Sequence, residues 1–461
     1  MENRRHQRKR KEKQLMAFLI FLFVLMLASV IGLTVKTAVQ RSAGNGNVQD
    51  VETLGPEPET EQEREKDILK DYVLEIPVPE TESETETETE SETETEEETE
   101  EEDTSQTEED EKVQTAEELL DKMTTEEKVA QLFMVTPEAL TGYNKVTTAE
   151  ELTQKALEEY PVGGLIYFAE NFVSPEQTKG MTGNVQKFAE EISGVPLFLA
   201  TDEEGGRVAR IGGNSAFDVE TVPDMASIGA GGDTKAAFQA GKTIGKYLYE
   251  LGINVDFAPV ADVLTNPDNQ AIGNRSFGSD PDKVALMDMY LMDGLLEEKV
   301  QACVKHFPGH GSSAGDTHTG AVSLDKTLEE LKATELVSFQ TCIDNGVSFV
   351  MVGHIELPQV TGNDRPASLS PKIITDILRE DMGYRGIVIT DAMNMGAITN
   401  RYNSREAAVM AIQAGADMVL MPKDFKEAYQ GVLEAIENGD LEMSRVDEAV
   451  KRILDLKFEI K

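Results

Sequence analysis

Eight short apolar stretches rich in β-branched residues recur between residues 130 and 421, each followed by a polar or glycine-rich loop and an amphipathic stretch. This alternation constrains the fold strongly, because strands that alternate with helices lie parallel and are joined by crossover helices. The predicted strands are 130–136, 163–168, 197–201, 253–260, 300–305, 348–353, 386–390 and 417–421.

Amphipathic patterns between these strands predict helices. Examples lie at 113–123, 234–251, 282–299, 326–345, 370–382, 404–414 and 424–438. Eight β/α units within residues 113–461 predict an α/β fold, a (β/α)8 TIM-type barrel that forms a single catalytic domain. A doubly wound open sheet is the alternative. No Gly-x-Gly-x-x-Gly or P-loop motif follows an early strand, which disfavours nucleotide binding.

The N-terminal residues follow different patterns. Residues 1–14 are strongly basic, and residues 15–35 contain no charge. A run of 21 uncharged residues is long enough to cross a bilayer core of about 30 Å. The positive-inside rule then predicts a cytoplasmic tail, a transmembrane anchor and a folded domain outside the membrane. A signal peptide cleaved between Ala38 and Ala43 is the alternative.

Residues 36–112 are rich in alternating threonine and glutamate. This pattern has no apolar period and repels itself, so we predict a disordered acidic linker between the anchor and the domain at 113–461. The domain itself carries a net charge of −25 within a total of −43. An acidic domain of this kind is not expected to bind nucleic acid. Cys303 and Cys342 lie in apolar stretches and are expected to be buried thiols.

Ionisable side chains gather directly after the predicted strands. They are Asp202 after the third strand, Arg275 in the loop after the fourth, Lys305 and His306 at the end of the fifth, His354 and Glu356 after the sixth, and Asp391 at the end of the seventh. The carboxyl ends of barrel strands surround one mouth, so we expect these side chains to converge. The histidines lack the spacing of a metal site.

The segment from Lys305 to His318 holds three of the five histidines. Asp316 lies two residues before His318, where a carboxylate can hold one imidazole nitrogen and leave the other for proton transfer. A polar loop that binds only solvent is the alternative. His310 is either a residue of the site or a residue that holds the loop in place by hydrogen bonds.

Asp391 fits either a nucleophile or the N-cap of the next helix. Glycoside hydrolysis needs a carboxylate nucleophile and an acid/base close to it. The candidates for the acid/base are Asp202, Glu203, Glu204, Glu356 and His318. An imidazole, with an intrinsic pKa of about 6.5, can both donate and accept a proton in one turnover.

Several of these residues also fit structural roles. Asp202 and Arg207 fit an ion pair, and Arg275 fits an ordinary surface residue. Asp256 and Asp262 are interpreted as supports of the site.

Seven motifs together resemble glycoside hydrolase family 3, in its β-N-acetylglucosaminidase branch. They are Met123–Lys128, Thr201–Val208, Phe257–Asp262, Arg275–Phe277, Lys305–Gly311, Asp316–His318 and Thr390–Asp391. The family more often has Asp-Ser-His where this sequence has Asp-Thr-His, which removes no group that the chemistry needs.

The resemblance implies a (β/α)8 barrel and a retaining double displacement, with no metal and no organic cofactor. It implies that Asp391 is the nucleophile and that His318, oriented by Asp316 on a mobile loop, is the acid/base. The residues that match the family's sugar-binding positions are Asp202, Arg275, Lys305 and His306. His354 and Glu356 are expected as further substrate-lining residues. Many relatives that act on β-glucosides take their acid/base from a second domain, whereas here the Asp316–His318 loop is the expected source.

The sequence thus predicts an exo-acting β-N-acetylglucosaminidase, held in a bacterial cell membrane, that acts outside the cytoplasm on saccharides derived from the peptidoglycan cell wall. Two alternatives within the family are a glycoside phosphorylase and a β-glucosidase or xylosidase. A stalked sugar-binding module without activity would be expected to have lost the nucleophile or the acid/base, and both are present.

Overall fold

The computed structural model describes residues 115–461. The predicted cytoplasmic tail (1–14), anchor (15–35) and linker (36–112) lie outside the described residues. No helix within 115–461 combines the length and the apolar character that a membrane span requires.

Eight parallel strands form a nearly closed barrel, in the order β11-β9-β7-β6-β3-β2-β1-β12. The strands are β1 (Phe133–Val135), β2 (Gly164–Ile166), β3 (Phe198–Thr201), β6 (Val255–Asp256), β7 (Gln301–Phe307), β9 (Phe349–Val352), β11 (Ile387–Thr390) and β12 (Val419–Leu420). A single parallel bridge between Ile389 and Met418 joins the two ends of the sheet, supported by a 3.0 Å bond from Thr390 N–H to the Met418 carbonyl. Each of the eight barrel strands overlaps one predicted strand, so the barrel is confirmed and the open sheet is not.

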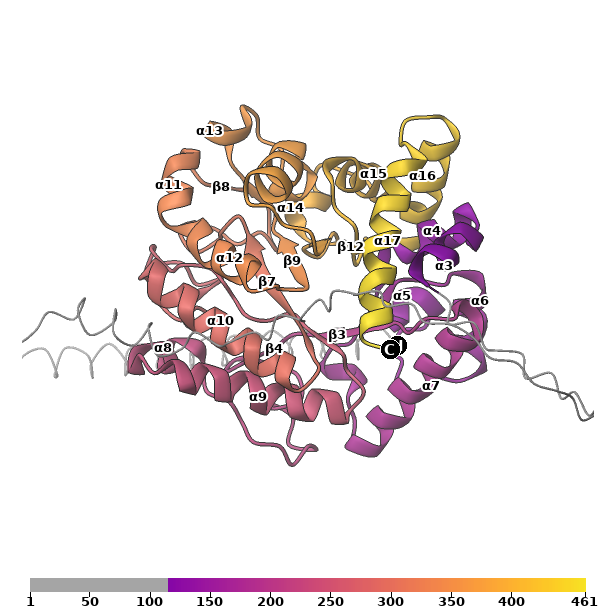
Figure 1. The fold of residues 1–461 in the computed structure, drawn as a ribbon, viewed down its shortest axis with the longest axis horizontal. Coiled ribbons are helices and arrows are strands. Elements are labelled where there is room, and N and C mark those ends of the chain that lie inside the picture. Colours follow the sequence, from indigo (N-terminus) through magenta and orange to yellow (C-terminus); the bar gives the residue numbers. More distant parts are fainter. Residues whose placement is uncertain (1–114) are drawn as a thin grey trace, which may run out of the picture. The chain divides into compact units, whose positions relative to one another are not determined.

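Helices surround the barrel, and the last ones pack beside the first (Figure 1). They are α3 (Ala116–Lys122), α4 (Thr125–Gln131), α5 (Pro137–Thr141), α6 (Glu151–Glu159), α7 (Pro175–Ser193), α8 (Met225–Gly231), α9 (Thr234–Glu250), α10 (Pro281–Glu297), α11 (Leu328–Ala333), α12 (Glu335–Asp344), α13 (Pro358–Thr361), α14 (Gly396–Thr399), α15 (Ser404–Ala414), α16 (Phe425–Glu437) and α17 (Met443–Glu459). The predicted helix at 326–345 is divided at Thr334, whose φ and ψ of −136° and −80° are not helical. The segment Lys372–Asp381 is wound as a π-helix.

Side-chain caps fix where several of these helices begin. Thr124 with Glu127, Ser174 with Gln177, and Asn403 with Glu406 each form a capping box. In a capping box the side chains satisfy backbone N–H groups that have no partner within the helix. Local sequence therefore sets the start of α4, α7 and α15.

Aromatic rings fill the barrel interior near the amino ends of its strands. The rings of Phe198 on β3 and Phe349 on β9 meet edge to face, with centroids 5.1 Å apart. Lys457 from α17 is also fully buried, and its Nζ lies 5.3 Å from the centre of the Phe198 ring. The packed end leaves only the carboxyl ends of the strands to form a site.

Candidate active site

A cavity of about 350 Å³ lies at the carboxyl ends of the strands. Seven residues selected from the sequence line it: Asp202, Glu204, Arg275, Lys305, His306, His318 and Asp391. The barrel therefore brings together side chains from the ends of β3, β7 and β11 and from the loops after β6 and β7.

Asp391 directly follows β11 and is held by its backbone and its side chain. Its N–H donates to the Val352 carbonyl at 2.8 Å, and its Oδ1 accepts the Ala392 N–H at 2.7 Å. Burial by itself would raise the pKa of Asp391, but the imidazoles of His354 and His306 and the Ala392 N–H hold it below its ordinary value. The next helix, α14, has Met395 as its N-cap, so Asp391 is not a helix cap. A charged carboxylate at the cavity suits a nucleophile.

Asp316 and His318 form a hydrogen-bonded pair on the loop after β7. The Oδ1 of Asp316 lies 2.8 Å from His318 Nδ1 and also accepts the His318 N–H at 2.9 Å. Burial works to raise the pKa of Asp316, but these bonds and the imidazole charge lower it. His318 Nε2 has no hydrogen-bond partner in residues 115–461, and 71% of the side chain is exposed. The pair can therefore transfer a proton through Nε2.

A buried network fixes the cationic side of the cavity. The Glu204 carboxylate accepts two bonds from Arg275, at 2.7 and 2.8 Å, and lies 2.6 Å from Lys305 Nζ. Burial would raise the pKa of Glu204, but Lys305 and Arg275 keep it well below its ordinary value. Lys305 Nζ also donates to Asp202 at 2.7 Å. The charges are thus paired and oriented without a ligand, as a preorganised polar site requires.

His306 is oriented by a carboxylate beneath it. Its Nδ1 lies 2.7 Å from Oδ2 of Asp262, which is fully buried. Asp256, also fully buried, accepts the Glu203 N–H at 2.9 Å. Both aspartates act as supports rather than as lining residues.

The whole barrel matches the family model described as "Glycosyl hydrolase family 3 N terminal domain", over residues 124–456. The chain belongs to glycoside hydrolase family 3.

Curated relatives and solved structures agree with this assignment. "Beta-hexosaminidase A" of Pseudoalteromonas piscicida is 33% identical over 340 residues, which cover 68% of this chain and 56% of that protein. "Beta-hexosaminidase LpqI" of Mycobacterium tuberculosis is 35% identical over 319 residues, covering 66% of this chain and 78% of that protein. A family 3 β-N-acetylglucosaminidase from Paenibacillus superposes with a TM-score of 0.69 at 37% identity, covering 73% of this chain and 63% of that one.

Two residues expected at the substrate do not line the cavity of this family 3 barrel. His354 is fully buried, with Nδ1 2.8 Å from Ser368 Oγ and Nε2 3.1 Å from the Ala392 carbonyl. Glu356 pairs with Arg401. The chain turns after β9 into the short strand β10 (Ile355–Glu356), which pairs with β8 (Val322–Ser323), and Glu356 does not reach the catalytic cavity. His354 therefore influences Asp391 from the protein interior and does not line the catalytic cavity.

Arg210 is a cavity residue that sequence reasoning missed. It approaches Asp202, with Nη2 3.6 Å from Oδ2, whereas Arg207 donates to backbone carbonyls in the loop at 270–272. Nε of Arg210 is buried and has no partner within residues 115–461. The alternative interpretation, an ion pair of Asp202 with Arg207, is therefore wrong. The only sequence signal for Arg210 is that it is a second arginine, three residues after Arg207.

Glu203 and His310 hold loops in place. The Glu203 carboxylate accepts the N–H groups of residues 210–212 and the Tyr247 hydroxyl, so it has no free oxygen for acid/base work. The Nδ1 of His310 lies 2.9 Å from Ser313 Oγ, and burial lowers the pKa of the imidazole. His310 thus ties the loop that leads to His318. Other cavity residues missed from the sequence are Phe168, Asn394 and Met421.

Proposed function

We propose that this protein is a retaining, exo-acting β-N-acetylglucosaminidase that hydrolyses terminal N-acetylglucosamine from saccharides. One observation carries the proposal: the half-buried, charged Asp391 and the exposed His318, which is paired with Asp316, border the same 350 Å³ cavity. A cavity of this size suits one small ligand. The polar network around it offers oriented donors and acceptors for sugar hydroxyl groups.

In the first step, Asp391 attacks the anomeric carbon and forms a glycosyl ester, while His318 Nε2 gives its proton to the departing glycosidic oxygen. In the second step, His318 takes a proton from water, and the hydroxide displaces Asp391 from the sugar. Two displacements retain the anomeric configuration. Asp316 stabilises the imidazolium form of His318, which is present before the first step and is formed again in the second.

Three relatives support the choice of sugar. Two are named β-hexosaminidases, and the Paenibacillus structure is titled a β-N-acetylglucosaminidase. The natural source of the saccharide is proposed from the sequence pattern. A basic tail, an apolar segment and a long acidic linker before the barrel would hold the domain outside a bacterial cell membrane, where cell-wall saccharides are available.

Assays of the full-length chain on aryl glycosides test the proposal. We expect hydrolysis of the β-N-acetylglucosaminide and little hydrolysis of the β-glucoside. Asp391→Ala and His318→Ala should each lower kcat by about 1000-fold or more, while the exposed control Asp381→Asn should retain full activity. A fluorinated substrate should leave a covalent adduct on Asp391, detected by mass spectrometry. Full activity in either active-site variant would refute the mechanism.

Phosphorolysis is the second candidate reaction, because a histidine acid/base repels phosphate less than a carboxylate would. Product analysis with and without phosphate separates the two reactions. Free N-acetylglucosamine in both conditions supports hydrolysis. Formation of a sugar phosphate in the presence of phosphate would show that the reaction is phosphorolysis.

A further inference from the structure

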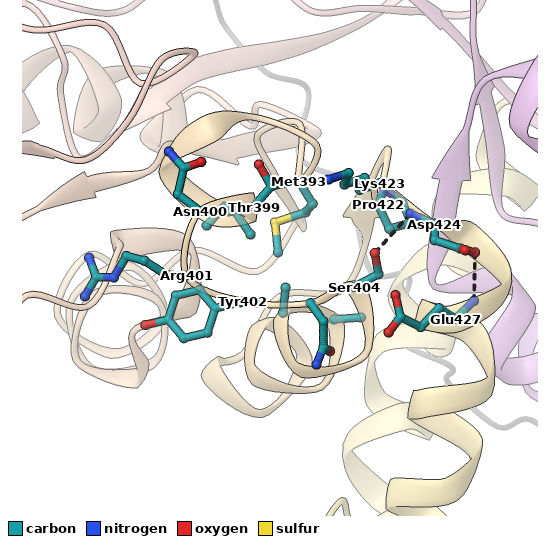
Figure 2. A pocket seen from close by; sticks show the side chains of 14 residues that line it. Met393, Thr399, Asn400, Arg401, Tyr402, Ser404, Pro422, Lys423, Asp424 and Glu427 are labelled. Atoms are coloured by element: carbon teal, nitrogen blue, oxygen red, sulfur yellow. Dashed lines mark hydrogen bonds between the residues drawn. The ribbon is translucent and has the colours of Figure 1, made fainter.

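A second cavity, of about 630 Å³, lies at the β11–β12 side of the barrel mouth and is shown in Figure 2. The same two chain segments contribute to both cavities. After β11, Ala392 lines the catalytic cavity and Met393 lines the second. After β12, Met421 lines the first and Pro422 lines the second. The two cavities are therefore neighbours.

The loop that carries His318 packs against a wall of the second cavity. Gly396 N–H donates to the His318 carbonyl at 3.1 Å, and Ala397 N–H donates to the Thr317 carbonyl at 3.1 Å. Asn400, which lines the second cavity, lies with its Nδ2 3.5 Å from the Thr319 carbonyl. The segment 396–400 thus touches the acid/base loop and also borders the second cavity.

A general acid must lie within hydrogen-bond reach of the oxygen that it protonates. In a glycosidase this oxygen belongs to the leaving group, so the leaving group begins beside His318. We propose that the second cavity binds the leaving-group saccharide, the sugar units on the reducing side of the cleaved bond. This inference rests on the proposed glycosidase function and adds the site that selects the remainder of the substrate.

The lining of the second cavity suits an uncharged saccharide. Met393 and Ile398 are buried and form an apolar floor. The rim is polar and includes Asn400, Tyr402, Asn403, Lys423, Asp424 and Glu427. An apolar surface with a few oriented polar groups is the usual composition of a small-molecule site.

The four charged residues of the lining, Arg401, Lys423, Asp424 and Glu427, balance in charge, which disfavours a phosphate or another strongly anionic group. Arg401 is held by Glu356 and by the Asp364 carbonyl at 2.9 Å. Lys423 and Glu427 form no ion pair with any residue in 115–461, so both can bond to sugar hydroxyl or acetamido groups. Figure 2 shows these two side chains near the first turn of α16.

The test compares two substrates of the full-length enzyme. Chitobiose has a sugar as its leaving group, whereas the aryl β-N-acetylglucosaminide has none. The ratio of their kcat/KM values is measured in wild type, Lys423→Gln, Glu427→Gln and the double variant. We expect chitobiose to lose about five- to tenfold relative to the aryl substrate in each single variant, and more in the double variant. Glu437→Gln, at the other end of α16, and Lys235→Gln on α9 are the matched controls and should keep the wild-type ratio.

A wild-type enzyme that hydrolyses both substrates, with an unchanged ratio in the double variant, overturns this inference alone. A wild-type enzyme that hydrolyses neither substrate overturns the proposed function and this inference with it. Circular dichroism of each variant confirms that the fold is retained.

Discussion

The N–H of Gly396 donates a 3.1 Å hydrogen bond to the carbonyl oxygen of His318. This bond joins the segment behind the nucleophile to the loop that carries the acid/base. A Cβ atom built on Gly396 would lie 2.8 Å from the backbone of Thr319 and 2.9 Å from the His318 carbonyl oxygen. The close approach of the two loops therefore requires glycine at this position.

Gly396→Ala should push the acid/base loop outward and lower kcat by about 10- to 100-fold, because a misplaced proton donor loses most of its effect. The loss should be larger for leaving groups that need protonation than for dinitrophenolate. Steady-state kinetics across a series of aryl leaving groups measures this difference. Gly183→Ala, in an open position on α7, is the control. Equal losses for all leaving groups would indicate a general disturbance instead.

His354→Gln should raise the pKa of Asp391, since the imidazole is the strongest of the groups that lower it. Burial lowers the pKa of His354 itself, so the imidazole charge acts only in acid solution. The acid limb of kcat/KM should consequently move to higher pH, whereas activity at neutral pH should change less. Rate profiles from pH 3 to 8 test this prediction, and an acid limb that stays in place would contradict it.

Glu203→Gln should weaken substrate binding and stability together. The carboxylate accepts N–H bonds at 2.6, 2.9 and 2.8 Å from Arg210, Ile211 and Gly212, and an amide nitrogen would oppose these donors. We expect a loss of about 2–4 kcal/mol in the free energy of unfolding and a higher KM, because Arg210 is displaced. Tyr247→Phe removes a single bond and should cost about 1 kcal/mol with little change in KM. An unchanged KM in Glu203→Gln would show that the segment 210–212, which Glu203 holds, does not contribute to substrate binding.

Lys457→Met should abolish part of the pH dependence of stability. Burial lowers the pKa of Lys457 to about 7, whereas an unfolded lysine keeps its proton to about pH 10. The unfolded state binds more protons between these values, so Lys457 makes the free energy of unfolding rise with pH, by about 2 kcal/mol from pH 7 to 9. Urea unfolding at both pH values should show this rise reduced in the variant. Parallel behaviour of wild type and variant would show that Lys457 does not titrate in this range.

The sequence by itself determined the order and position of the eight strands. Strand and helix periods, and the glycine and polar residues that separate them, are local properties that each segment carries independently. It also indicated the Asp316–His318 pair, since a spacing of two residues brings the side chains together on a turn without help from distant segments. Asp391 was indicated for a similar reason, because a charged residue at the end of an apolar strand must lie at the barrel mouth.

Only the tertiary structure decided which side chains beyond the strand ends reach the cavity. The network of Glu204, Lys305 and Arg275 joins residues from three separate segments, and it depends on how strand β7 and the segments after β3 and β6 pack together. Packing also placed Arg210 instead of Arg207 beside Asp202 and kept His354 and Glu356 out of the catalytic cavity. The direction of a side chain after a strand end is set by contacts with neighbouring units of the barrel, and those contacts are not written in the local sequence.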